Sequence, residues 1–119
     1  MAEALESRHC VPCEGGTPPL DAQQIRPLLD QLDEGWAIEE AGDHEQLWHA
    51  FRTKDFVSAV GFVNAITPVA EEEGHHPDLM VGWGRVRVML WTHAAGGLTE
   101  NDFILAAKIS RVARDLGLT

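Results

Sequence analysis

The sequence predicts an α+β domain with the element order α-β-β-α-β-β-α, in which a four-stranded antiparallel sheet carries helices packed on one face. Two patterns lead to this prediction: segments with a helical repeat of apolar residues, and pairs of short segments rich in aromatic and β-branched residues, each pair joined by a turn. A chain of 119 residues has room for one hydrophobic core. We therefore assign residues 20–119 to a single domain and residues 1–19 to a flexible N-terminal segment.

The first predicted helix covers residues 20–32. Asp21 can cap it, because Gln24 follows three residues later as in a capping box, and leucine and isoleucine side chains recur at helical spacing. Pro27 lies inside this segment, where a proline removes a backbone hydrogen bond and clashes with the preceding turn. We therefore expect either a kink or a late start for this helix.

The second predicted helix follows Asp55 and ends at Gly74. Pro68 falls within it, close to Glu71, so a bend there could shift that carboxylate. The apolar stripe that should face the core consists of Phe56, Ala59, Val63, Ile66 and Ala70.

Four short segments predict two β-hairpins. The first pair, residues 35–41 and 46–53, flanks a turn-like stretch and is rich in residues that favour strands. The second pair covers residues 79–84 and 85–92. Alternation in the last of these strands should place one set of side chains in the core, namely Val86, Val88 and Leu90.

The last predicted helix begins after Thr99, its N-cap, and ends at Gly117. Asp102 stands at the N3 position, where a capping box and the positive end of the helix both favour a carboxylate. Capping alone is therefore enough to account for Asp102. Contact with an active site is an equally weighted second interpretation.

The charge balance limits the classes of partner. Nine Lys and Arg against nineteen Asp and Glu give a net charge of -10, which repels a phosphate backbone and an anionic membrane surface. The start of the chain does not resemble a secretion signal, and no run approaches the ~20 apolar residues that span a bilayer. We expect a cytoplasmic protein that binds neither nucleic acid nor membrane.

Both cysteines, Cys10 and Cys13, stand in a C-x-x-C motif preceded by His9. This spacing could bind a metal or form a redox pair, but a structural zinc site usually has four ligands, and a thioredoxin-like motif needs a βαβ context. We therefore favour reduced cysteines in the flexible N-terminal segment, without a disulfide.

Residues 71–77 read EEEGHHP and combine three carboxylates with two adjacent histidines. A pair of histidines by itself is more often a feature of a surface loop than of an active site. The residues downstream give the pair its meaning, because Trp83, His93 and Asp102 follow it at specific gaps.

This spacing resembles the motif of the pterin-4a-carbinolamine dehydratases at Glu71, His75, His76, Pro77, Trp83, His93 and Asp102. The resemblance has no insertion between residues 71 and 102, and the element order over residues 20–117 is also similar to that family. It implies a small α+β enzyme that dehydrates a 4a-hydroxytetrahydropterin to quinonoid dihydropterin, a recycling step that serves aromatic amino acid hydroxylases.

Removal of water from a carbinolamine requires an acid that protonates the hydroxyl at C4a and a base that takes the proton from N5. Histidine suits both roles, because its ordinary pKa of ~6.5 lies near neutral pH. The reaction needs neither a metal nor a redox cofactor, so we expect none. By resemblance the catalytic residues are His75, His76 and His93, with His75 and His93 favoured for proton transfer.

The other residues of the motif have supporting roles by resemblance. Glu71 orients an imidazole and raises its basicity. Trp83 either walls the pterin pocket or belongs to the core. Pro77 fixes the backbone after the histidines, since a proline biases the residue before it toward an extended conformation. Glu72 and Glu73 are expected to face solvent.

Two other functions are compatible with the sequence. One is a non-catalytic dimerisation or assembly-factor module on the same fold, which the retention of all three histidines disfavours. The other is a metal protein built on Glu71, His75, His76 and His93, which we disfavour because adjacent histidines seldom bind one ion.

The predicted sheet also implies self-association. An open four-stranded sheet leaves two edge strands with unpaired backbone groups, which proteins cover or pair. The family pairs them, so the resemblance implies a homodimer or a homotetramer. It leaves open which pterin side chain is accepted.

Overall fold

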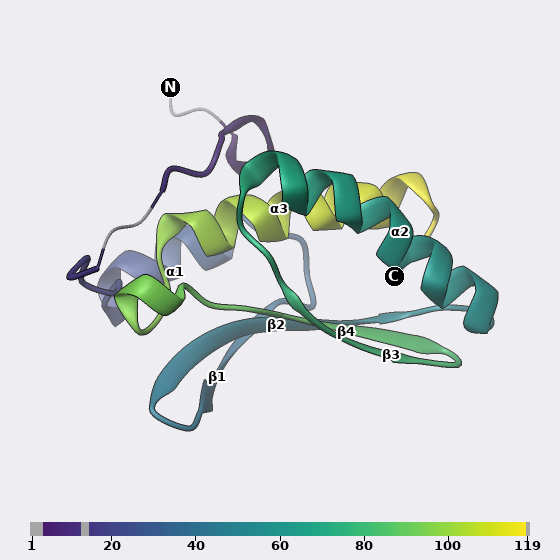
Figure 1. Ribbon diagram of the computed structural model, residues 1–119, viewed down its shortest axis with the longest axis horizontal. Helices are drawn as coiled ribbons and strands as arrows, with labels where there is room; N and C mark the ends of the chain where they lie inside the picture. The colour runs from purple at the N-terminus through teal and green to yellow at the C-terminus, as the bar shows by residue number, and fades with distance from the viewer. Residues whose placement is uncertain (1–3, 13–14, 119) are drawn as a thin grey trace.

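The structure has two layers, a four-stranded antiparallel sheet and three helices that all lie on one of its faces (Figure 1). A computed structural model describes residues 4–12 and 15–118. The strands are β1 (Ala37–Ala41), β2 (His44–Arg52), β3 (Asp78–Gly82) and β4 (Arg85–Leu90), in the spatial order β1-β2-β4-β3. The helices are α1 (Ala22–Asp30), α2 (Phe56–Glu73) and α3 (Glu100–Asp115). The predicted fold class and element order are confirmed.

The two hairpins meet at the centre of the sheet, where β2 pairs with β4. Leu47 of β2 is opposite Leu90 of β4, and both side chains are fully buried beneath the helices. The alternation predicted for β4 is confirmed, since Val86 and Val88 are also fully buried. The edge strands β1 and β3 each pair on one side only.

Helix α1 begins at Ala22 and contains Pro27, so the predicted alternative of a late start is wrong. The capping box forms as predicted: Gln24 N donates to Asp21 Oδ1 at 2.9 Å, and Asp21 N donates to Gln24 Oε1 at 2.9 Å. This cap satisfies two backbone donors that an isolated helix start leaves unpaired, which lets the helix start ahead of the proline.

Helix α2 runs as one helix through Pro68 and ends as predicted at Gly74, whose φ of 62° lies in the left-handed region that glycine adopts without strain. One member of the predicted stripe is wrong. Phe56 is 52% exposed, whereas Phe62 is fully buried. Phe56 is the first residue of the helix.

The N-terminal residues 4–12 lie near α3 and include a short 3-10 turn, η1 (Leu5–Ser7). Leu5 is buried in the core. Cys13 falls outside the described residues, so the C-x-x-C interpretation stays a prediction, as does the flexibility of residues 1–19. Within the part of the chain that the structure describes, none of the helices has the length and apolar character needed to cross a membrane.

Candidate active site

A cleft of about 630 Å³ opens where the end of α2 and the end of β4 meet the start of α3. The end of α2 continues directly into the histidine pair, because Gly74 reverses the chain and Pro77 leads it into β3. The cleft brings together five of the predicted site residues in its lining: Glu71, His75, His76, Pro77 and His93.

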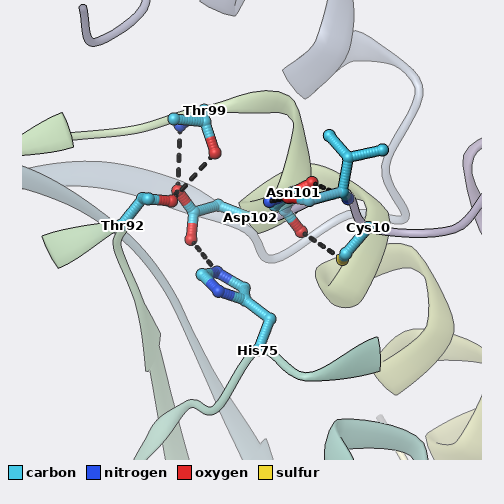
Figure 2. Close-up of polar contacts among 7 residues, drawn as sticks. Cys10, His75, Thr92, Thr99, Asn101 and Asp102 are labelled. Atoms are coloured by element: carbon cyan, nitrogen blue, oxygen red, sulfur yellow. Dashed lines mark hydrogen bonds and ion pairs between the residues drawn. The ribbon is translucent and has the colours of Figure 1, made fainter. Parts of the chain in front are cut away.

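Asp102 contacts the ring of His75 (Figure 2) and is not itself among the residues that line the cleft. His75 Nε2 lies 2.6 Å from Asp102 Oδ1, and the Asp102 side chain has no solvent exposure. Asp102 therefore contacts a histidine of the cleft, and the predicted cap also forms, because the same carboxylate completes the capping box of α3 with Thr99.

The second carboxylate oxygen of Asp102 is bound by two further donors. Thr92 Oγ1 and Thr99 N each donate to Asp102 Oδ2 at 2.9 Å, and the two threonine hydroxyls lie 2.8 Å apart. A carboxylate that is buried and accepts several hydrogen bonds has one fixed orientation. His75 is thus oriented by a network that joins the end of β4 to the start of α3.

Glu71 pairs with His76 instead of His75. The hydrogen bond joins Glu71 Oε2 to His76 Nε2, and both side chains are largely exposed. The two histidines of the pair therefore have separate carboxylate partners in different surroundings, one buried and one in solvent.

His93 lies in a short 3-10 turn, η2 (His93–Ala95), which Trp91 and Thr92 separate from the last residue of β4. Its ring stacks on Trp91 at a centroid distance of 3.9 Å, and the ring of His44 also stacks on Trp91, at 3.5 Å. Trp91 lines the cleft. The position of the His93 ring is thus set by an aromatic contact.

Trp83 lies in the turn between β3 and β4, is 69% exposed, and is not among the residues that line the cleft. It is therefore not part of this chain's core either. Trp91, Thr92 and Asn101 occupy the site without having been predicted. Trp91 had a weak signal, since it precedes His93 by two residues in the predicted strand 85–92, but the contacts of Thr92 and Asn101 depend on the tertiary structure.

The expectation that Glu73 faces solvent is wrong, because only 2% of its side chain is exposed. Its carboxylate accepts hydrogen bonds from Cys10 N at 2.6 Å and from His9 Nδ1 at 2.9 Å, and Lys108 Nζ lies 3.5 Å away. Burial acts to raise the pKa of Glu73, but these donors and the Lys108 charge outweigh it and hold the pKa below its ordinary value. Glu72 is exposed, as expected.

Among the described residues, a group with ligand atoms close enough to hold a metal ion consists of His9, Glu72 and Glu73, whose atoms lie within 4.8 Å of one another. The group contains none of the three cleft histidines. Cys10, next to it, is an unsuitable ligand in its protonated state: burial and the charge of Glu73 raise the pKa of its thiol to about 12.

Comparison with known proteins gives a consistent match. Residues 18–112 match the family model described as pterin 4 alpha carbinolamine dehydratase. A Rickettsia canadensis protein, provisionally named pterin-4-alpha-carbinolamine dehydratase, is 48% identical over 105 residues, which are 88% of this chain and 94% of that protein. A Rubrobacter xylanophilus protein of the same provisional name is 45% identical over 112 residues, 94% of this chain and all of that protein.

Two solved structures share the fold. A transcriptional coactivator/pterin dehydratase from Brucella melitensis superposes with a TM-score of 0.71 at 33% identity, covering 80% of this chain and 98% of that one. A pterin dehydratase-like protein identified as a RuBisCO assembly factor of the alpha-carboxysome superposes with a TM-score of 0.57 at 23% identity, covering 67% and 90%. The second likeness concerns the fold alone.

Proposed function

Because this chain belongs to the pterin 4 alpha carbinolamine dehydratase family, we propose that it dehydrates a 4a-hydroxytetrahydropterin to the quinonoid dihydropterin by histidine acid/base catalysis. The observation that carries the proposal is the presence of His75, His76 and His93 in the lining of one cleft. In this reaction the C4a–O bond breaks, the hydroxyl leaves as water after protonation, N5 loses its proton, and a C4a=N5 double bond forms.

His75 is proposed to exchange a proton through Nδ1. An ionised carboxylate only accepts hydrogen bonds, so Asp102 fixes the proton of His75 on Nε2, 2.6 Å away, and leaves Nδ1 as the nitrogen that can gain or lose a proton. Asp102 also stabilises the imidazolium that forms when Nδ1 accepts a proton. A positioned group of this kind contributes on the order of 10²- to 10⁴-fold to a rate.

His93 is the proposed partner of His75 in proton transfer. Its ring is exposed to the cleft and held by stacking on Trp91. His76, which is paired with Glu71 in solvent, is proposed to hold the pterin, with Glu71 orienting its ring and Pro77 fixing the backbone. The acid and the base would thus come from separate elements, the end of α2 and the end of β4.

The test is a stopped-flow assay of 4a-hydroxytetrahydropterin dehydration by the wild type, His75→Ala, His76→Ala and His93→Ala. We expect His75→Ala and His93→Ala to lose about 10²-fold or more in kcat, and His76→Ala to raise KM with a smaller change in kcat. Circular dichroism checks that each variant is folded. Added imidazole should partly restore His93→Ala, since that side chain is exposed.

Two results would change the proposal. Rates equal to the uncatalysed background in the wild type and all variants would reject the enzyme and favour the non-catalytic module. A loss of only a few-fold in His75→Ala, with a large loss in His76→Ala, would move proton transfer to His76.

The proposal extends to the setting of the enzyme. We propose that it acts in the cytoplasm, in tetrahydropterin recycling that serves an aromatic amino acid hydroxylase. We also propose a homodimer or homotetramer, because β1 and β3 are open edges and β3 exposes Met80 and Val81 by 57% and 42%. Size-exclusion chromatography with light scattering tests this: a species of 13.1 kDa alone at micromolar concentration would reject it.

A further inference from the structure

One wall of the cleft comes from the N-terminal segment. Residues 9–12, here called the strap, contribute Cys10, Val11 and Pro12 to the lining. The strap lies outside residues 18–112, the part of the chain that matches the family model. The proposed catalytic histidines come from elsewhere, so the strap would affect the shape of the cleft and not its proton-transfer groups.

Asn101 holds the middle of the strap (Figure 2). Its side-chain amide bonds both backbone groups of one residue: Val11 N donates to Asn101 Oδ1 at 3.0 Å, and Asn101 Nδ2 donates to Val11 O at 2.6 Å. The thiol of Cys10 donates to Asn101 O at 3.5 Å. Asn101 is therefore bound to the strap as a neighbouring strand would be, at a position next to Asp102 in α3.

Glu73 holds the start of the strap. Its buried carboxylate accepts from the backbone of Cys10 and from the ring of His9, and lies beside the Lys108 ammonium group. Glu73 ends α2, two residues before His75. The two anchors thus join the strap to the same two helix ends that position His75 and Asp102.

The exposed parts of the strap suit a flat heteroaromatic ligand. The Val11 side chain is apolar, and the residue is 66% exposed although its backbone is fixed. Together with Pro12 and Trp91, it gives the cleft an apolar surface next to the imidazole groups. Apolar walls with a few placed polar groups are the usual composition of a small-molecule site.

We propose that the strap is a substrate-binding wall of the cleft, and that Asn101 and Glu73 are positioning residues that hold it closed on the pterin. This inference rests on the proposed function. It predicts that release of the strap weakens substrate binding and leaves the proton-transfer step largely intact.

The first experiment compares KM and kcat of the full chain with those of Asn101→Ala, Glu73→Gln and Val11→Pro. The last removes the N–H that Asn101 accepts while altering an exposed residue, so it is the variant safest for folding. We expect KM to rise about three- to tenfold, because each variant loses one or two of the hydrogen bonds that hold the strap. We expect kcat to change less than about twofold. The matched controls are Asn64→Ala and Glu40→Gln, which make the same kinds of change at exposed positions and should keep the wild-type KM.

A second experiment measures the accessibility of the strap by chemical labelling and does not depend on turnover. The chain has two cysteines, so in a Cys13→Ser background iodoacetamide labels Cys10 alone. Labelling should be slow at pH 8, because burial and the neighbouring Glu73 carboxylate raise the pKa of the Cys10 thiol to about 12, and the thiolate is the form that reacts. We expect Asn101→Ala and Val11→Pro to accelerate labelling, and 7,8-dihydrobiopterin, a stable isomer of the proposed product, to slow it.

The outcomes separate the two proposals. Unchanged KM in all three strap variants, or a labelling rate that 7,8-dihydrobiopterin does not alter, overturns the strap proposal even if the wild type dehydrates the pterin. Protection of Cys10 by 7,8-dihydrobiopterin in a protein with no dehydration activity supports the strap and rejects the proposed reaction. An equal fall of kcat and kcat/KM in the strap variants also overturns the strap proposal, because the strap would then act in the transition state alone.

Discussion

Two histidines that line the cleft pair with carboxylates of the same chemistry in opposite surroundings. His75 pairs with Asp102, which has no solvent exposure and is fixed by Thr92 and Thr99. His76 pairs with Glu71, and both of these side chains are more than 60% exposed. The two histidines are neighbours in one loop, yet only the pair of His75 with Asp102 has its geometry set by the fold.

This difference shows that burial, more than the identity of the two groups, decides what a pair can contribute. An exposed pair is worth about 0–1 kcal/mol, because water and salt screen it and two mobile side chains must be ordered. A buried carboxylate that loses its hydrogen-bond partners costs free energy of folding, so its hydrogen bonds are retained and the side chain keeps one orientation. We expect the buried pair to govern both stability and chemistry, and four predictions test this contrast.

The largest expected effect is on stability. Asp102→Ala removes the acceptor for Thr92, Thr99 and His75 at once, and should lower the free energy of unfolding by about 3–5 kcal/mol in urea denaturation. Glu71→Ala is the matched change in the exposed pair and should cost about 1 kcal/mol or less. Equal losses in the two variants would remove the distinction drawn between the pairs.

Next in size is the effect of Asp102→Asn on turnover. The amide keeps the shape of the carboxylate, but its NH₂ group can donate to His75 Nε2, which would move the imidazole proton to Nδ1. We expect kcat to fall about 10²-fold with a much smaller loss of stability than in Asp102→Ala. A pH–rate profile of kcat for the variant and the wild type measures how the changed position of the His75 proton affects turnover. Wild-type kcat in this variant would show that Asp102 serves the helix cap only.

A buried histidine outside the cleft extends the contrast to pH. Burial lowers the pKa of His49, which stacks on Phe51 at 3.8 Å. The unfolded chain therefore binds more protons than the folded one below the ordinary histidine pKa of ~6.5. Stability should be complete above that pH and decrease as the pH falls below it.

The measurement for His49 is thermal unfolding at pH 7.5 and pH 5.5. His49→Gln should show a smaller loss of Tm between these values than the wild type, because glutamine does not titrate. His76→Gln, the exposed control, should keep the wild-type dependence. A wild-type dependence in His49→Gln would assign the effect to other groups.

The smallest expected effect belongs to Glu71→Gln. Since the pair with His76 is exposed, kcat/KM should fall less than about fivefold at low ionic strength, and the difference from wild type should shrink further at 1 M salt. Asp102→Asn should lose activity by the same factor at both salt concentrations. A large salt-independent loss in Glu71→Gln would place that carboxylate in direct contact with the substrate.

The sequence by itself determined the order of the helices and strands. It also determined those residues of the cleft that are close to one another along the chain. The caps at Asp21 and Thr99, the end of α2 at Gly74, and the alternation of Val86, Val88 and Leu90 are local signals, because each depends on residues within a few positions. The fold class and the cleft positions of Glu71, His75, His76 and His93 followed from such signals and from the resemblance.

Only the tertiary structure decided which carboxylate meets which histidine. Asp102 is 27 residues from His75, and Glu73 meets Cys10 across 63 residues, so no local pattern distinguishes their buried roles from a helix cap or a solvated charge. For the same reason Trp91, and not Trp83, lies in the cleft: Trp83 stands in the turn before β4 and Trp91 follows the last residue of β4, so the place of β4 in the sheet sets where each ring goes. Long-range packing fixes the surroundings of a side chain, and the surroundings decide what its chemistry can do.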